Sequence, residues 1–419
     1  MRLRWLAVWS CLLAALAIGL TACGDDDDDE GGGGGGGGDT AKVVSSLPLQ
    51  GASRPQTTAM VNGIELALEQ AGGKAGDITI EYESLDDSTA QVGSWTPEAT
   101  SANAREAAQD DSVVAYIGEF NSGASAISMP ILNEGGLAQV SPANTAVGLT
   151  TDEPGADEGE PDKYYPLGLE NRHYVRIVPK DTIQGAALAT LMSEDGCGNV
   201  YILNDKEVYG AGLSRNIEAS AEEQGLEVLG NDGIDPKAPN FRSLASQMAD
   251  AGTECFVYSG ITANNAVQLF KDVEAAIPDA QLYGPDGIAE SGFADPAEGG
   301  IPANVAAKTK VTVATLSPDQ YPPEGQKFFD DFAKEYGEDN PDPYAIYGYE
   351  AMRLVIDAIE RAGSTDRQAI IDALFDTKGR ESVLGTYDID ENGDTTLTDY
   401  GVYSIDGGEL SFDQTIQAE

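Results

Sequence analysis

A regular alternation of strand-like and helix-like segments is the feature that most constrains the fold of this chain. From residue 42 on, short runs rich in β-branched and aromatic residues alternate with longer runs in which apolar residues recur every three or four positions. This alternation predicts parallel sheets that are covered by helices on both faces. Such sheets bind ligands beyond the carboxyl ends of their strands, so the strand-to-helix loops are the segments to search for a site.

The alternation occurs in two runs. The predicted strands share a high content of Val, Ile and Tyr, and they lie at 42–47, 77–83, 112–118, 137–141, 198–204, 226–230, 255–260 and 280–284. Helices are predicted between them, at 60–71, 122–132, 209–224, 241–251 and 263–276. An acidic stretch rich in Gly and Pro, 150–170, separates the two runs and is expected to be an exposed excursion. The sequence therefore predicts an α/β protein with two doubly wound lobes.

The last third of the chain departs from this pattern. A strand at 311–316 precedes three predicted helices, and residues 384–412 alternate and turn like antiparallel strands. So many late helices indicate that the chain returns to the first lobe, so that several crossovers form a hinge. We expect lobe 1 to comprise residues 41–175 plus 316–386, and lobe 2 to comprise residues 176–315 plus 387–419.

The N-terminal segment has the layout of an export signal. Residues 1–22 contain two arginines, an apolar run and small residues, and the apolar run is shorter than the roughly 20 residues of a membrane-spanning helix. Leu20-Thr21-Ala22-Cys23 resembles the lipobox of bacterial lipoproteins, which implies lipid attachment at Cys23. The alternative is an ordinary cleaved signal with a cysteine there by chance. Residues 23–40, rich in Asp and Gly, are expected to be an extended tether.

Composition limits the partners. The chain has 71 acidic and 24 basic residues, for a formal net charge of −47. Nucleic acid and anionic lipid are not expected as partners, because phosphate contacts require Lys and Arg.

Cys197 and Cys255 each stand just before a predicted strand of an exported chain, so we expect a disulfide if those strands are neighbours. Two buried free thiols are the alternative.

Metal and triad chemistry have little support. The chain has one histidine, His173, which argues against a zinc site or a Ser–His triad. The segment DIDENGDTTLTD (388–399) nearly matches a calcium loop, but its twelfth position is Asp399 instead of glutamate and its flanks look like strands. Asn-Gly also favours a hairpin, which is our interpretation. No cofactor is expected.

Three strand-to-helix loops are rich in small polar residues. They are GEFNSGAS (118–125), VSPANT (140–145) and YGPDGIAE (283–290). In this order they resemble loops of the periplasmic branched-chain amino-acid-binding proteins, as do DKEVYGAGL (205–213), DPYAIYGYEAM (342–352) and LGTYDIDENGD (384–394). The resemblance spans about residues 42 to 412. It implies the type I periplasmic-binding-protein fold and a monomeric, hinged receptor that delivers its ligand to an ABC transporter permease from the outer face of the membrane.

The resemblance also implies a site. Ser122 and Thr145 would offer hydroxyl groups to the α-carboxylate of a small amino acid or related amide, beside the positive end of the helix that follows Ser122. The carbonyl of Ala143 and the carboxylate of Asp286 would receive the ligand ammonium. The implied ligand contacts are Ser122, Ala143, Thr145, Tyr209, Asp286 and Tyr344, with the two tyrosines on opposite lobes.

Other interpretations stay open from the sequence. Ser122 could merely cap its helix, the loops could be plain turns, and the tyrosines could be core residues. The same fold also serves ligand-sensing receptors of signalling systems, which need a partner kinase or channel. An extracellular α/β enzyme is a third possibility, but no nucleophile and base stand out, and we expect no enzymatic activity.

Overall fold

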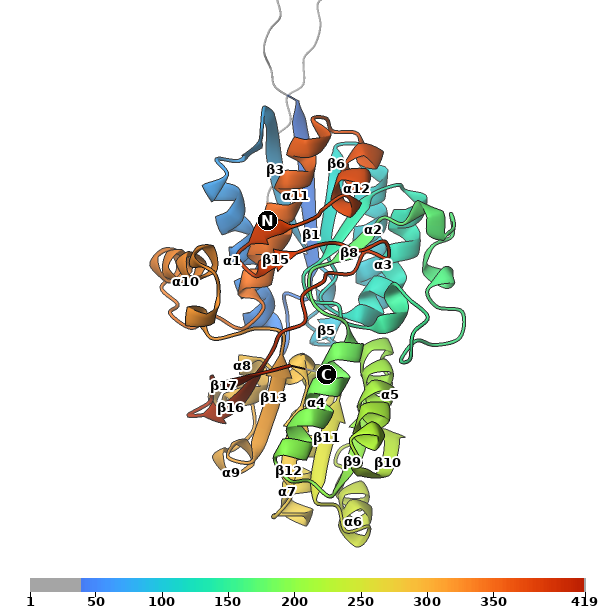
Figure 1. Cartoon of the computed structure of the whole chain (residues 1–419), viewed down its shortest axis with the longest axis vertical. Helices are drawn as coiled ribbons and strands as arrows, with labels where there is room; N and C mark the ends of the chain where they lie inside the picture. The colour runs from blue at the N-terminus through green and yellow to red at the C-terminus, as the bar shows by residue number, and fades with distance from the viewer. Residues whose placement is uncertain (1–38, 418–419) are drawn as a thin grey trace, which may run out of the picture. The chain divides into compact units, whose positions relative to one another are not determined.

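The computed structural model describes residues 39–417, which contain two open sheets, each packed between helices (Figure 1). The predictions for the signal peptide and for Cys23 lie outside these residues. Within the described part, no helix is both long enough and apolar enough to span a membrane.

The first sheet has six strands in the order β2-β3-β1-β6-β7-β8. All neighbours are parallel except the edge pair β2–β3. The strands are β1 (Thr40–Leu47), β2 (Lys74–Ala75), β3 (Ile78–Asp86), β6 (Val113–Gly118), β7 (Ala138–Ser141) and β8 (Tyr174–Arg176). Their helices are α1 (Arg54–Gln70), α2 (Pro97–Gln109), α3 (Ser122–Glu134), α10 (Pro323–Tyr336), α11 (Ala345–Ala362) and α12 (Arg367–Phe375).

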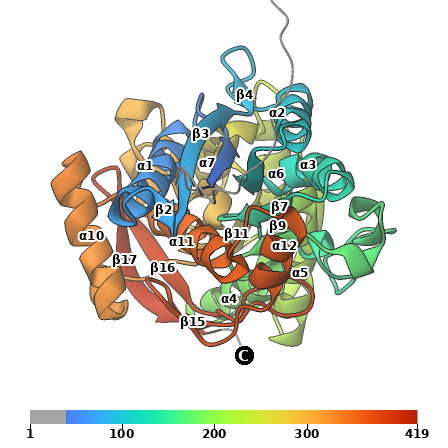
Figure 2. The ribbon, with the colours of Figure 1, turned by 90° about the horizontal axis from the view of Figure 1, so that it is seen from above.

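Helices cover both faces of this sheet because its strands are apolar on both faces. Val43 and Leu47 of β1 belong to the core that includes Met60 of α1, whereas Val44 packs with Ala104 of α2. Figure 2 shows α1 and α11 on one side of the sheet and α2 and α3 on the other. Continuous apolar runs are what parallel strands with two covered faces require.

The second sheet has seven strands in the order β10-β9-β11-β12-β13-β16-β17. The first five are parallel, and β16 and β17 are antiparallel additions. They are β9 (Asn199–Asn204), β10 (Glu227–Gly233), β11 (Cys255–Ser259), β12 (Gln281–Gly284), β13 (Thr309–Val313), β16 (Tyr400–Asp406) and β17 (Glu409–Ile416). Its helices are α4 (Asp181–Glu194), α5 (Val208–Glu223), α6 (Arg242–Asp250), α7 (Ala266–Ala276), α8 (Ser291–Ala294) and α9 (Ala303–Ala306). Because β9 and β11 are neighbours, Cys197 and Cys255 lie together and form a disulfide.

Three segments connect the two halves. The chain crosses between β8 and α4, between β13 and α10, and between β15 and β16. Strand β15 (Gly385–Tyr387) pairs with β14 (Arg380–Ser382). We call the half with the six-stranded sheet lobe 1 and the other lobe 2. The residue boundaries that we gave for the lobes remain our proposal. The crossovers make the hinge that the sequence predicted.

Some elements were missed or misjudged from the sequence. Helices α2 and α4 and strand β8 were not predicted from the sequence. Helix α2 has only alanines as apolar residues, and helix α4 is apolar on most of its faces, so neither shows a clear helical period of apolar residues. Strand β8 is only three residues long, which is too short to show an alternation. The excursion at 150–170 is not simply exposed, because Tyr164 and Tyr165 are buried in a cluster with Met129 of α3.

The segment 388–399, which nearly matches a calcium loop in its sequence, lies in the last crossover and contains a turn held by its own hydrogen bonds. Ile389 and Thr395 form an antiparallel bridge, and Asp390 Oδ1 accepts hydrogen bonds from the backbone N–H groups of Asn392 and Asp394 at 2.8 and 2.9 Å. The carboxylate of Asp394 forms a salt bridge with the guanidinium of Arg176. No cluster of three potential metal ligands occurs within residues 39–417.

Candidate ligand-binding site

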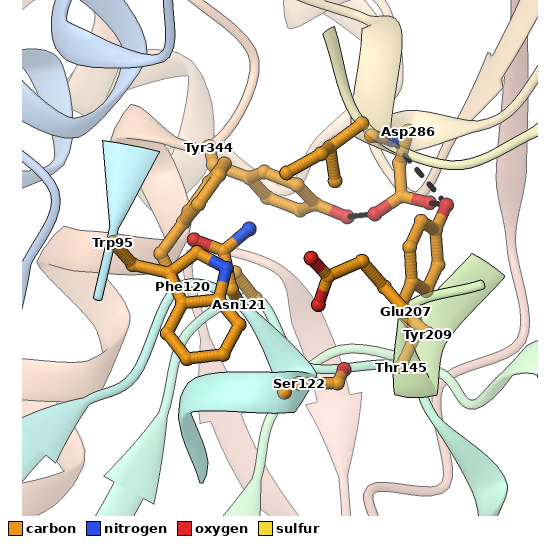
Figure 3. Close-up of a pocket in the computed structure, with 13 residues that line it drawn as sticks. Trp95, Phe120, Asn121, Ser122, Thr145, Glu207, Tyr209, Asp286 and Tyr344 are labelled. Atoms are coloured by element: carbon orange, nitrogen blue, oxygen red, sulfur yellow. Dashed lines mark hydrogen bonds between the residues drawn. The ribbon is translucent and has the colours of Figure 1, made fainter. Parts of the chain in front are cut away.

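All six residues that the sequence singled out line one cavity between the lobes (Figure 3). Lobe 1 contributes Ser122, Ala143, Thr145 and Tyr344. Lobe 2 contributes Tyr209 and Asp286. The volume of the cavity is small, about 30 Å³. The lobes are therefore closed in this structure, and an amino acid can enter only if they separate or side chains move.

The lobe 1 wall offers hydrogen-bond donors to an anion. Ser122 is the first residue of α3, a helix of 13 residues, so the positive end of the helix dipole points at the cavity. Thr145 is buried, and its hydroxyl group makes no hydrogen bond of good geometry among the described residues, although it lies beside the carboxyl group of Asp181. A buried hydroxyl without a well-oriented partner beside a helix N-terminus is suited to a carboxylate.

The loop that carries Ala143 and Thr145 is fixed by two buried groups. Ser141 Oγ accepts hydrogen bonds from the N–H groups of Ala143 and Asn144 at 3.3 and 2.9 Å. The fully buried guanidinium of Arg176 donates to the carbonyl of Ala146 at 2.7 Å. Its Nε lies 2.6 Å from Asp394 Oδ1 in the last crossover. Arg176 thus joins the binding loop to the hinge.

Asp286 forms the acidic end of the cavity. Tyr209 Oη donates a hydrogen bond to Asp286 Oδ1 at 2.6 Å, and Tyr344 Oη donates to Oδ2 at 2.8 Å (Figure 3). The pKa of Asp286 lies above its ordinary value, because burial raises it by more than the hydrogen bonds from the two phenols lower it. The phenols orient the carboxylate and leave it lone pairs for a cationic ligand group.

A second carboxyl group lies behind this end. Asp181, the first residue of α4, is buried, and neither of its oxygens has a well-oriented hydrogen-bond partner among the described residues. Burial and the negative charge of Asp286 raise the pKa of Asp181, and the neighbouring Thr145 hydroxyl and Arg176 charge offset only part of this rise. The lobe 2 wall therefore favours a cation.

Contacts at the rim join the lobes. Arg215 of α5 donates to the carbonyl of Gly155 at 2.6 Å and to Asp157 at 2.9 Å. Ser291 of α8 donates to Asp342 through its N–H and its hydroxyl, both at 3.1 Å. These contacts stabilise the closed arrangement.

A comparison with known families places this architecture. A family model described as "Periplasmic binding protein" matches residues 40–409. The chain belongs to the periplasmic binding protein family. The predicted resemblance and fold class are thereby confirmed. Family membership puts the body of this binding protein outside the cytoplasm, and the family consists of substrate-binding transport proteins rather than enzymes.

Curated relatives and solved structures agree with this assignment. The binding protein is 25% identical over 373 residues to the leucine-, isoleucine-, valine-, threonine- and alanine-binding protein of Pseudomonas aeruginosa, covering 87% of this chain and 90% of the relative. It is 25% identical over 368 residues to the Leu/Ile/Val-binding protein homolog 2 of Brucella abortus, covering 86% and 89%. The crystal structure of the leucine-binding protein LivK of Thermotoga maritima superposes with a TM-score of 0.76 at 23% identity, covering 90% of this chain and 99% of that one. The structure of LivJ from Streptococcus pneumoniae, in complex with isoleucine, gives 0.74 at 19% identity, covering 90% and 99%.

Further residues of the binding protein line the cavity. The predicted set lacked Trp95, Phe120, Asn121, Gly123, Glu207, Ile261 and Gly287. Five of them lie in loops that the resemblance had marked. Phe120, Asn121 and Gly123 belong to GEFNSGAS, Glu207 belongs to DKEVYGAGL and Gly287 belongs to YGPDGIAE. Trp95 lies on the two-residue strand β5 (Ser94–Trp95), which pairs with β4 (Ser88–Thr89), and no motif pointed to it.

Proposed function

We propose that this protein is a solute-binding lipoprotein that captures a small amino acid between its lobes and delivers it to an ABC transporter permease. The observation that carries the proposal is that the hydroxyl groups of Ser122 and Thr145 of lobe 1 and the carboxylate of Asp286 of lobe 2 line one cavity between the lobes. The names of the relatives add that proteins of similar sequence bind leucine, isoleucine and valine.

One part of the cavity matches the ammonium and the carboxylate that every α-amino acid carries. The hydroxyl groups of Ser122 and Thr145 and the N-terminus of α3 receive the ligand carboxylate. Asp286 and the carbonyl of Ala143 receive its ammonium. Charge-assisted hydrogen bonds contribute about 1.5–3 kcal/mol each, and burial of an aliphatic stem adds about 2 kcal/mol. Three or four such bonds reach the roughly 8 kcal/mol of a micromolar dissociation constant after the cost of association.

The division of contacts between lobes explains how binding is signalled. A ligand that touches both lobes binds the closed conformation more tightly than the open one, so it shifts the population toward closure. A permease that docks on both lobes of a monomer can then distinguish the loaded receptor from the empty one.

Calorimetry with a screened ligand tests this function. A thermal-shift screen of amino acids and amides selects the ligand, and its affinity is then measured with the Asp286→Ala variant. We expect a loss of at least about 2 kcal/mol, because the ammonium loses its counter-charge in a closed cavity. Asp250→Ala, an exposed position at the end of α6, is the matched control. Unchanged affinity in Asp286→Ala would remove this residue from the site.

The lipid anchor is a separate part of the proposal. It is supported by the lipobox-like Leu20–Cys23 and by the Asp- and Gly-rich segment that follows. The Cys23→Ser variant is expected in the culture medium, since the thiol that takes the lipid is gone, whereas Cys11→Ser stays with the membrane. Continued membrane fractionation of Cys23→Ser contradicts the anchor.

A further inference from the structure

We propose that Glu207 determines specificity by pairing with a positively charged ligand side chain, so that the ligand is a basic amino acid such as lysine or ornithine. This inference rests on the proposed function, because it assumes that the cavity holds an amino acid. It adds the chemistry of the side chain, which the contacts to ammonium and carboxylate leave open.

Glu207 belongs to lobe 2 but reaches the wall of lobe 1. It immediately precedes α5, and its carboxylate points into the middle of the cavity (Figure 3). A methyl group added to Gly123 of α3 would lie 3.1 Å from Glu207 Oε2 and 2.9 Å from the ring of Trp95. The carboxylate therefore occupies space that any ligand must share.

This carboxylate has no structural task that accounts for its position. Glu207 is the N-cap residue of α5, yet its side chain makes no capping hydrogen bond. Its one side-chain hydrogen bond within residues 39–417 is a long one, 3.4 Å from Asn264 Nδ2 to Oε1. Burial, followed by the negative charge of Asp205, raises the pKa of Glu207 to about 7. The ionised form of such a carboxyl group is disfavoured in the empty cavity, and a cation that enters the cavity stabilises it.

The charge balance of the cavity favours a ligand with a net positive charge. Among the described residues that line it, none is Lys, Arg or His, whereas both Glu207 and Asp286 are acidic. A zwitterion brings one positive and one negative charge, so it compensates Asp286 and leaves Glu207 unpaired against an aliphatic side chain. A second ligand ammonium pairs with Glu207, and the rings of Trp95 and Phe120 can cover the carbon stem that carries it.

Two ligands with the same four side-chain carbons separate these possibilities. L-Lysine and L-norleucine differ by the terminal ammonium, and calorimetry compares them on the full mature protein. We expect lysine to bind at least tenfold more tightly than norleucine. In Glu207→Gln the ratio should fall to near one, with lysine weakened. Glu223→Gln, an exposed position at the end of the same helix, should keep the wild-type ratio.

The outcomes distinguish this inference from the function on which it rests. Norleucine or leucine binding as tightly as lysine overturns the role of Glu207 and leaves an amino-acid receptor intact. An unchanged ratio in Glu207→Gln, with an unfolding temperature like that of the wild type, does the same. If no amino acid binds to the wild-type protein, the proposed function fails together with the inference.

Discussion

Tyr344 donates a hydrogen bond of 2.8 Å to Asp286 across the boundary between the lobes. Tyr344 precedes α11, which packs on lobe 1, while Asp286 follows β12 of lobe 2. The carboxylate that we assign to the ligand ammonium is therefore also a closing contact. Ligand binding and lobe closure share one group, so changes at either residue should affect both.

The Tyr344→Phe variant tests this shared role. It keeps the ring but removes the donor, so Asp286 loses one of its two phenol partners. Hydrogen bonds to charged groups contribute about 1.5–3 kcal/mol, so we expect the ligand dissociation constant to rise roughly 10- to 100-fold in calorimetry. Tyr349→Phe is the control, because Tyr349 donates to Gln70 rather than to a cavity residue. Equal affinities in both variants would contradict the role of Tyr344.

The Arg176→Met variant tests the coupling of hinge and binding loop. Removal of the guanidinium leaves Asp394 buried without its main partner, and breaking a buried ion pair typically lowers the free energy of unfolding by about 3–5 kcal/mol. Urea unfolding measures this loss. The double variant Arg176→Met/Asp394→Asn should recover part of it, because no buried charge is stranded. A single variant as stable as the wild type would show that the pair contributes little.

The disulfide should stabilise the protein by restricting its unfolded chain. Cys197 and Cys255 are 58 residues apart, and closing a loop of that length is worth up to about 4 kcal/mol in the chain-entropy model. The Cys197→Ser/Cys255→Ser variant should therefore unfold at a lower urea concentration than the oxidised wild type. Reducing agent should lower the midpoint of the wild type and leave that of the variant unchanged. Two alkylated thiols in the unreduced protein would refute the disulfide.

Buried carboxyl groups predict a loss of stability as pH rises. Burial raises the pKa of Glu290 to about 7 from its ordinary 4.5. The folded protein thus binds more protons than the unfolded chain between these values, and the free energy of unfolding falls as pH increases through this window. Glu290→Gln should gain stability over the wild type from pH 4.5 to pH 8, by up to about 3 kcal/mol.

His173 acts with the opposite sign. Burial lowers its pKa to about 3, so its contribution to stability is present above pH 6.5 and is lost as pH falls. The difference between Glu290→Gln and the wild type at each pH isolates the carboxyl group from this effect. Glu298→Gln, an exposed position, is the control. A difference that does not change with pH would contradict the raised pKa.

Local patterns predicted most of the fold, because strands and helices that bury one face leave a period in the sequence. The helix at 209–224, for example, lies at Val208–Glu223. The six cavity residues were predicted by a resemblance of loops, and their contact with a ligand is still a prediction. Arg176 and Asp394 could not be paired from the sequence, because they are 218 positions apart and meet only when the hinge forms. Trp95 was missed because its two-residue strand carries no pattern.

The central claim is that one amino acid is held from both lobes at once. A crystal structure of the protein with its ligand measures this directly. We predict the ligand nitrogen within about 3 Å of the Asp286 carboxylate, and its carboxylate within about 3 Å of the hydroxyl groups of Ser122 and Thr145. A ligand bound outside this cavity, or one that contacts a single lobe, would contradict the account.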